Sequence, residues 1–299
     1  MTESAHTQPK PYALFLGCNI PVRVVNYEMS ARKVAEGLGL NFVDIPDFSC
    51  CGYPLADEDR GETLLMSARN LALAEKAGCD VCALCSACTG ALTEAAHYLK
   101  ENEEVRAGIN ERLAEFGLQY NATVKVIHFA RMLFEEIGEE ALRAKITHPL
   151  NDLRIAPHYG CHYLKPSGIY GFDSVEDPKT LDRLIALTGA TPIDYPSKLN
   201  CCGGGIMAVS EETALKVSRV KLEKVAAAGA DAIGLVCPFC GFMYDTNQKK
   251  IESRFEQEYG IPVLFLTQIL GLAMGFDPND LGMKVNRVKP KELLAKIGA

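Results

Sequence analysis

The strongest constraint on this chain is an arrangement of five cysteines that occurs twice along its 299 residues. In each half, a single cysteine is followed by an adjacent pair and then by a Cys-x-x-Cys motif. The spacing between these elements is similar in the two halves, and the stretch from the pair to the Cys-x-x-Cys motif is almost equal in length. The two sets are Cys18, Cys50, Cys51, Cys85 and Cys88, and Cys161, Cys201, Cys202, Cys237 and Cys240. Because the arrangement recurs, the sequence predicts one structural unit used twice.

The segments between the cysteines predict alternating strands and helices in both halves. Short apolar runs precede the single cysteine, the pair and the Cys-x-x-Cys motif, and a fourth run closes each half. The expected strands are 12–16, 40–45, 79–84, 124–128, 154–157, 190–195, 232–236 and 261–266, and the main expected helices are 26–38, 61–77, 89–100, 178–188, 211–228 and 242–258. Such alternation indicates an α/β fold with parallel sheets.

We therefore expect two pseudo-symmetric α/β domains, residues 10–145 and 150–285. A basic tail at 286–299 should form an extra helix or a docking arm. In parallel sheets, functional sites gather beyond the carboxyl ends of the strands. Because most of the repeated cysteines directly follow expected strands, they should meet at that edge, near the domain interface. Glycines adjoin these cysteines and leave room for the backbone to approach a bulky inorganic ligand. They are Gly17, Gly52, Gly160 and Gly203–Gly205.

The 12 cysteines need an explanation other than covalent stapling. A chain of this length can bury a sizeable core without disulfides, and residues 1–10 lack the apolar stretch of a secretory signal. We expect a cytoplasmic protein whose reduced thiols serve in metal binding or redox chemistry. The net charge of −7 argues against nucleic acid as a partner, and no apolar stretch is long enough to span a membrane.

Five thiolates per half are one more than zinc or an ordinary four-iron cubane requires. Thiolate is a soft ligand that suits zinc, Cu(I) or iron–sulfur clusters. The side chains of adjacent cysteines diverge, so a pair binds neighbouring irons more easily than a single ion. The pattern favours a larger or unusual cluster in each half, and a zinc-stabilised structural protein is the alternative. The two cysteines outside the repeat, Cys79 and Cys82, fit small buried apolar residues.

The motifs around the cysteines resemble those of the B subunits of heterodisulfide reductases, a family with two cysteine-rich CCG motifs. The matching segments are Phe15-Leu-Gly-Cys18, Cys50-Cys51-Gly52, His158-Tyr-Gly-Cys-His-Tyr-Leu-Lys-Pro166, Cys201-Cys202-Gly-Gly-Gly205 and Cys237-Pro-Phe-Cys240. The resemblance implies two non-cubane 4Fe–4S clusters, each bound by one five-cysteine set, which face each other across the domain interface. It also implies that a small-molecule disulfide is cleaved or formed between them.

Four side chains near the cysteines are candidates for proton transfer and substrate binding. His158 and His162 flank the first cysteine of the second set, and histidine transfers protons well near neutral pH. Their alternative roles are to cap a strand end or to donate a hydrogen bond to cluster sulfur. Lys165 and Arg23 are candidates for binding an anionic substrate, with simple solvation as the alternative. His128 ends an expected strand and should lie in the core or at an interface.

The resemblance implies the catalytic iron–sulfur subunit of a heterodisulfide reductase-like complex, an oxidoreductase acting on disulfides or thiols. The sequence has no Gly-x-Gly-x-x-Gly segment after a strand and no ferredoxin-type cysteine run, so electrons should arrive from another protein. The resemblance implies a ferredoxin-like C-type subunit and an A-type flavoprotein as partners, and the basic tail is a candidate contact. The alternative is an electron-transfer or docking subunit of a related quinone- or sulfur-linked complex.

Overall fold

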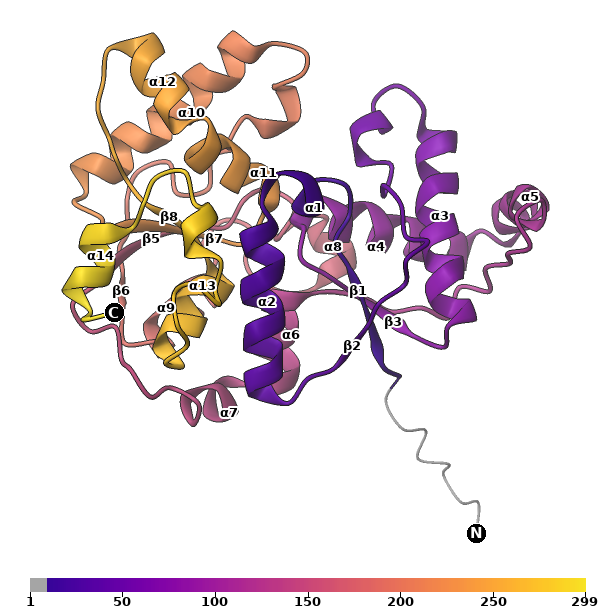
Figure 1. The fold of residues 1–299 in the computed structure, drawn as a ribbon. Coiled ribbons are helices and arrows are strands. Elements are labelled where there is room, and N and C mark those ends of the chain that lie inside the picture. The colour runs from indigo at the N-terminus through magenta and orange to yellow at the C-terminus, as the bar shows by residue number, and fades with distance from the viewer. Residues whose placement is uncertain (1–9) are drawn as a thin grey trace.

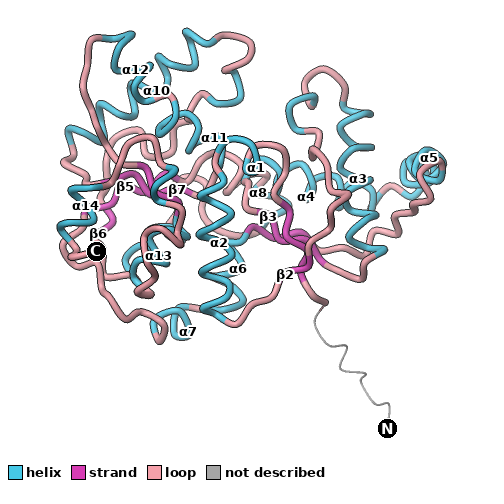
Figure 2. The backbone as a smooth tube through the Cα atoms, viewed as in Figure 1, coloured by secondary structure: helices cyan, strands magenta, loops and turns pink. Residues whose placement is uncertain are grey.

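Two four-stranded parallel sheets, one in each half of the chain, form the framework of the protein. The computed structural model describes residues 10–299. The strand order is β2-β1-β3-β4 in the first sheet and β6-β5-β7-β8 in the second. The same order therefore occurs twice, and Figure 2 shows the two short groups of strands flanked by helices. The predicted α/β class and the duplication are confirmed.

The first half contains four strands and the helices that connect them. The strands are β1 (Tyr12–Phe15), β2 (Phe42–Val43), β3 (Asp80–Ala83) and β4 (Val126–His128). The α-helices are α1 (Ile20–Arg23), α2 (Val25–Leu38), α3 (Arg60–Lys76), α4 (Ser86–Glu101), α5 (Glu103–Ala114), α6 (Phe129–Met132) and α7 (Glu139–Arg143). A 3₁₀ turn, η1 (Tyr53–Leu55), follows the first cysteine pair, and a π-helical turn, η2 (Leu133–Ile137), follows α6.

The second half repeats this order. The strands are β5 (Arg154–His158), β6 (Thr191–Pro192), β7 (Ala232–Leu235) and β8 (Val263–Phe265). The α-helices are α8 (Ser167–Tyr170), α9 (Thr180–Leu187), α10 (Glu211–Ala227), α11 (Pro238–Gly241), α12 (Gln248–Phe255), α13 (Leu266–Ala273) and α14 (Lys291–Lys296). The short turns are η3 (Gly204–Ile206), the π-helical η4 (Phe242–Thr246) and η5 (Met283–Val285).

Equivalent capping residues begin the two long helices that follow the cysteine pairs. The Asp59 carboxylate accepts a hydrogen bond from the Glu62 amide at 3.0 Å and caps α3. The Ser210 hydroxyl accepts one from the Thr213 amide at 3.4 Å and caps α10. Such caps satisfy amides that have no partner within the helix. The two halves therefore start these helices at equivalent positions.

The two halves share a packed interface that centres on α2 and α13. In Figure 1, α2 lies between the two sheets, beside α13. The Tyr27 ring stacks on Phe265 with ring centroids 4.0 Å apart. The Ser30 and Thr267 hydroxyls are hydrogen-bonded at 2.7 Å in the same buried contact. One apolar cluster consequently includes residues from both halves.

The carbonyl of Val236 is the most heavily used polar contact across this interface. It accepts hydrogen bonds from Tyr27 Oη at 3.1 Å, Ser86 Oγ at 3.3 Å and His128 Nε2 at 3.0 Å. All three donors come from the first half, and Val236 directly precedes Cys237 of the second. His128 is buried there, as the sequence predicted. These bonds fix the position of a second-half cysteine relative to the first half.

The predicted elements differ from the observed ones mainly at their ends. The expected helix at 242–258 is divided at Asn247 into η4 and α12, because the Asn247 side chain donates to the Phe242 carbonyl at 2.9 Å. The tail contains α14, which packs on the second half through buried Leu293 and an ion pair between Lys296 and Asp231. The predicted extra helix is confirmed, whereas the domain limits stay predictions. Within residues 10–299, no helix is long and apolar enough to cross a membrane.

Candidate metal centre

The ten repeated cysteines form one continuous series of thiol contacts. Neighbouring thiols lie close enough to shift one another's pKa, and the series runs through both halves. Its order is Cys18, Cys50, Cys51, Cys88, Cys85, Cys237, Cys240, Cys202, Cys201 and Cys161. The second five repeat the first five in reverse order, so the arrangement has the pseudo-twofold symmetry of the fold.

The two sets meet at the contact between Cys85 and Cys237. Both thiols are buried, and each residue stands at the N-cap of a helix, α4 for Cys85 and α11 for Cys237. At the opposite ends, Cys18 and Cys161 are exposed, as is Cys201. Each set therefore runs from a solvent-accessible thiol to a buried one at the interface between the halves.

Contacts between neighbouring thiols lower the pKa of some cysteines and raise that of others. Hydrogen bonds from Cys18 and Cys51 lower the pKa of Cys50, and those from Cys161 and Cys202 lower the pKa of Cys201. Contact with Cys240 and Cys85 lowers the pKa of Cys237. Thiolate is the form that binds metal. Within residues 10–299, no three His, Cys, Asp or Glu side chains surround one point as ligands of a single metal ion do.

Serines on α3 and α10 hold the loops that carry the cysteine pairs. Ser67 Oγ donates to the Cys51 carbonyl at 2.7 Å, and Ser218 Oγ donates to the Cys202 carbonyl at 2.6 Å. The two serines are buried and occupy equivalent positions, 16 residues after the cysteine concerned. Each half thus uses the same side chain to place its cysteine pair at the carboxyl edge of the sheet.

Gly17 is required by a close approach to the first cysteine set. Its φ is +64°, in the left-handed region, and a Cβ at this position would lie 2.8 Å from Cys88 Sγ. That region costs an ordinary L-residue about 1–2 kcal/mol. Any side chain here would displace the Cys88 thiol. The predicted close approach of the Gly17 backbone to a bulky ligand stays a prediction.

The two candidate histidines occupy different environments. His158 is fully buried, and its Nε2 lies 3.1 Å from Cys240 Sγ. His162 is partly buried, and its Nε2 lies 3.0 Å from the hydroxyl of Tyr53, a first-half residue. A Cβ on Gly90 of α4 would lie 3.2 Å from His162 Nδ1, so this ring is enclosed by the first half. Both histidines therefore adjoin the cysteines, but only His162 joins the two halves.

Sequence reasoning did not identify Tyr53 as a partner of His162. The two residues are 109 positions apart, and only the fold brings them together. The equivalent position in the second half is a glycine, Gly204, so the repeat gave no signal for Tyr53. Lys221 on α10 was also missed, although it is 1% exposed and lies within electrostatic reach of second-set cysteines.

The remaining sequence candidates lie at the surface or in the core. Lys165 is exposed, and the exposed Arg23 places its guanidinium 4.5 Å from the centre of the Phe242 ring. Cys79 and Cys82 are buried, as predicted, and the Cys79 thiol donates to the Ala77 carbonyl at 3.5 Å. Burial raises the pKa of both of these thiols. Their roles as core residues agree with their place outside the repeat.

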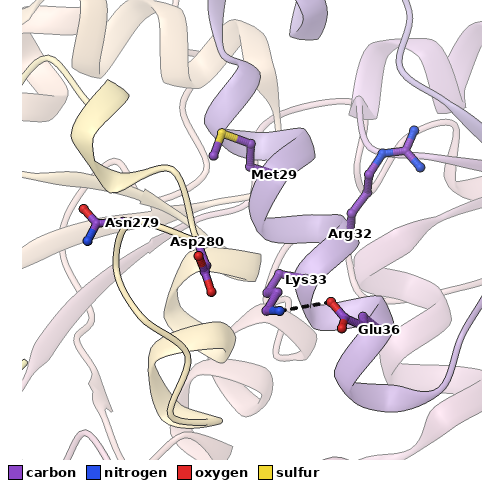
Figure 3. A pocket seen from close by; sticks show the side chains of 6 residues that line it. All are labelled: Met29, Arg32, Lys33, Glu36, Asn279 and Asp280. Atoms are coloured by element: carbon purple, nitrogen blue, oxygen red, sulfur yellow. Dashed lines mark hydrogen bonds and ion pairs between the residues drawn. The ribbon is translucent and has the colours of Figure 1, made fainter.

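A shallow surface pocket lies apart from the cysteines, between α2 and the segment before η5 (Figure 3). Charged and polar side chains dominate it, and Lys33 pairs with Glu36 at 3.1 Å. It is lined by Met29, Arg32, Lys33, Glu36, Asn279 and Asp280. None of these residues belongs to the cysteine sets, and the pocket contributes no thiol to the site.

Comparison with known proteins connects the site to cysteine-rich redox proteins. The cysteine-rich CCG domain matches this chain twice, at residues 12–93 and 155–245. The B subunit of the ferredoxin/F(420)H(2)-dependent CoB-CoM heterodisulfide reductase of Methanosarcina acetivorans is 38% identical over 95% of this chain and 96% of its own. The 8-methylmenaquinol:fumarate reductase membrane anchor subunit of Wolinella succinogenes is 31% identical over 95% of this chain and 99% of its own.

A solved structure supports the fold. A hypothetical protein from Helicobacter pylori has a TM-score of 0.79 and 21% sequence identity. The match covers 94% of this chain and 52% of the other, so the present chain spans about half of that protein. At this identity the likeness shows the arrangement of strands and helices alone.

Proposed function

The chain belongs to the CCG-domain family of heterodisulfide reductase B subunits, and from this premise we propose that it is the catalytic iron–sulfur subunit of a heterodisulfide reductase or related complex. Its similarity to these B subunits indicates membership of an oxidoreductase complex. The proposed reaction is cleavage or formation of a small-molecule disulfide. Its balance is R–S–S–R′ + 2 e⁻ + 2 H⁺ = RSH + R′SH.

The contact between Cys85 and Cys237 is the observation that carries this proposal. It brings two five-cysteine sets into one constellation with an exposed thiol at each end. Two independent electron-transfer sites would not need to be in contact. Cleavage of a disulfide, in contrast, converts two bonded sulfur atoms into two thiols, so a site for each sulfur must lie beside the other.

The residues present fit two iron–sulfur groups of the non-cubane 4Fe–4S type. Ten thiols supply the soft ligands that iron–sulfur groups require, and Gly17 leaves the space that a Cβ would fill beside Cys88. Each five-cysteine set would hold one group. When bound, such groups would supply electrons one at a time.

Side chains of this protein would bind the substrate and supply the protons that its reduction requires. His162 Nε2 and the Tyr53 hydroxyl share a hydrogen bond close to the exposed Cys161, so this pair can hold a proton beside the substrate. Histidine is well suited to that role near neutral pH. His158 is also a proposed catalytic residue, and its bond to Cys240 supports a role in orienting a cysteine ligand. The exposed cations Arg23 and Lys165 would attract an anionic substrate.

Electrons would come from a separate iron–sulfur protein, a ferredoxin-like C-type subunit supplied in turn by an A-type flavoprotein. Large apolar side chains are exposed on the segments that follow both cysteine pairs, namely Leu55, Ile206 and Val209. Exposed apolar groups beside a redox site are typical of surfaces that another protein covers. They support a partner that docks near the exposed thiols.

Anaerobic purification followed by iron and acid-labile sulfide analysis tests the cofactor. About eight of each per chain are expected from two four-iron groups, and a colourless zinc protein would refute the proposal. Electron paramagnetic resonance of the same sample, with and without added disulfide or thiol, tests catalysis. Signals that change on addition support the catalytic role.

The alternative is an electron-transfer or docking subunit, which the similarity to a fumarate reductase membrane anchor subunit favours. In that case the protein would contain the same iron, but its paramagnetic resonance signals would not respond to disulfides or thiols. The two functions are thus separated by one measurement on one preparation.

A further inference from the structure

The two halves differ at one buried position next to the cysteine pairs. Asn70 on α3 and Lys221 on α10 occupy equivalent places, one helical turn after the serine that holds the cysteine pair of their own half. Both side chains are buried, with 0% and 1% exposure. The first half therefore has a neutral amide where the second half has a cation.

The two side chains also make different contacts. Asn70 donates to the Cys50 carbonyl at 3.1 Å and accepts from the Ser49 amide at 2.9 Å, so its polar atoms are satisfied locally. Lys221 Nζ donates to the carbonyls of Ser197 and Lys198 at 2.5 and 2.8 Å. Among residues 10–299, Lys221 forms no salt bridge with a carboxylate.

A buried cation without a carboxylate partner needs negative charge nearby. Burial lowers the pKa of Lys221 to about 8, and the neighbouring Cys240, Cys202 and Cys201 oppose that shift as negative groups would. Its Nζ also lies 5.5 Å from the centre of the Tyr195 ring. The second-set cysteines would supply the counter-charge when they are ionised as metal ligands. The neighbouring Lys198 differs, because its Nζ is already paired with Asp182 at 2.7 Å.

A second difference between the halves, at the position of His158, should also stabilise the reduced form of the second-set group. Three positions before the single cysteine, the second half has His158 and the first half has Phe15. His158 Nε2 lies 3.1 Å from Cys240 Sγ and can donate a hydrogen bond to that thiolate. A phenylalanine ring has no such donor. Nearby positive charge and hydrogen bonds to sulfur both stabilise the reduced form of an iron–sulfur group.

We propose that Lys221 gives the iron–sulfur group of the second cysteine set the higher reduction potential, so that the second half of the chain accepts the first electron. This inference rests on the proposed function. The first electron leaves the reduced iron–sulfur donor protein and is stabilised near Lys221. A second electron from the same class of donor completes the pair that a disulfide consumes, together with two protons.

Redox titration of the full chain, followed by electron paramagnetic resonance, tests the inference. Wild-type protein should show two different midpoint potentials. Lys221→Gln keeps hydrogen-bond donors but removes the charge. It should reduce the equilibrium constant for one-electron reduction of the higher-potential group at least about tenfold, which lowers its midpoint potential by ~59 mV. Lys221→Arg should keep the wild-type value.

Matched variants separate this effect from general changes of charge or folding. Lys198→Gln removes an equal charge that is already neutralised, and should leave both potentials in place. His158→Phe introduces the residue found at the equivalent first-half position, Phe15, and should lower the same midpoint potential as Lys221→Gln. If Lys221→Gln loses its iron, the His158→Phe variant provides the test instead. Equal wild-type potentials, or an iron-containing Lys221→Gln protein with unshifted potentials, would overturn the inference alone. A wild-type chain without iron would overturn the proposed function as well.

Discussion

Replacing Gly17 by alanine should selectively damage the first cysteine set. The backbone φ of +64° alone costs an alanine about 1–2 kcal/mol. The new Cβ would also lie 2.8 Å from Cys88 Sγ, well inside the ordinary contact distance of ~3.5–4.0 Å. Overpacking of this kind costs about 1–3 kcal/mol more. Because the Cys88 thiol must move to relieve the contact, we expect Gly17→Ala to lose about half of the bound iron and about 2–5 kcal/mol of stability.

Gly39→Ala is the matched control for this prediction. Its φ is +73°, but nothing lies within 4 Å of the position a Cβ would take. The variant should lose only about 1–2 kcal/mol and should keep all of its iron. Iron and acid-labile sulfide per chain, together with anaerobic urea unfolding, measure both effects. Equal iron contents and equal stabilities for the two variants would refute the idea that Gly17 makes space for the Cys88 thiol.

Three further predictions concern a cysteine outside the two sets, Cys79, and two residues at the interface between the halves, Tyr27 and His128. Cys79→Ser keeps the hydrogen bond to a backbone carbonyl and should retain full iron, whereas Cys88→Ser should lose iron from the first set; the same iron analysis checks both. Tyr27→Phe removes one of three donors to the Val236 carbonyl, so the free energy of unfolding in urea should fall by about 0.5–1.5 kcal/mol with no change in iron. Burial lowers the pKa of His128 in the folded protein to about 4. Between about pH 7 and 5, the His128 side chain therefore becomes protonated in the unfolded chain but stays neutral in the folded one. The free energy of unfolding should fall by about 2 kcal/mol as the pH falls over that interval. The corresponding measurement on His128→Gln should lack this component, and an unchanged pH dependence would contradict the assignment.

The sequence predicted all eight strands because each is a short apolar run that precedes a cysteine or closes a half. It overestimated β2 and β6, which pair over only two residues each. Both are edge strands, and an edge strand is paired on one side only. The length of an apolar run therefore set an upper limit on these strands, while the contact with a single neighbour determined their observed ends.

Sequence spacing assigned the cysteines to two sets but could not predict how the sets meet. The contact between Cys85 and Cys237 depends on how α2 and α13 pack, and these helices come from opposite ends of the chain. Gly203 shows a related limit. A Cβ there would lie 2.8 Å from the Ala214 carbonyl oxygen of α10, so helix packing alone requires a glycine at this position, a reason that the sequence did not indicate.

The positions that the two halves keep and those that they change differ in the contacts that they make. The helix caps Asp59 and Ser210 and the serines that hold the cysteine pairs are equivalent in both halves, because each loop must be placed at the sheet edge in the same way. Lys221 replaces an amide one helical turn further on, where it adds a buried charge and binds the carbonyls of Ser197 and Lys198. In the proposed reaction, a duplicated fold with identical surroundings would act in the same way on both sulfur atoms of the disulfide. Charge differences at buried positions beside a shared geometry are the simplest way for such a fold to distinguish them.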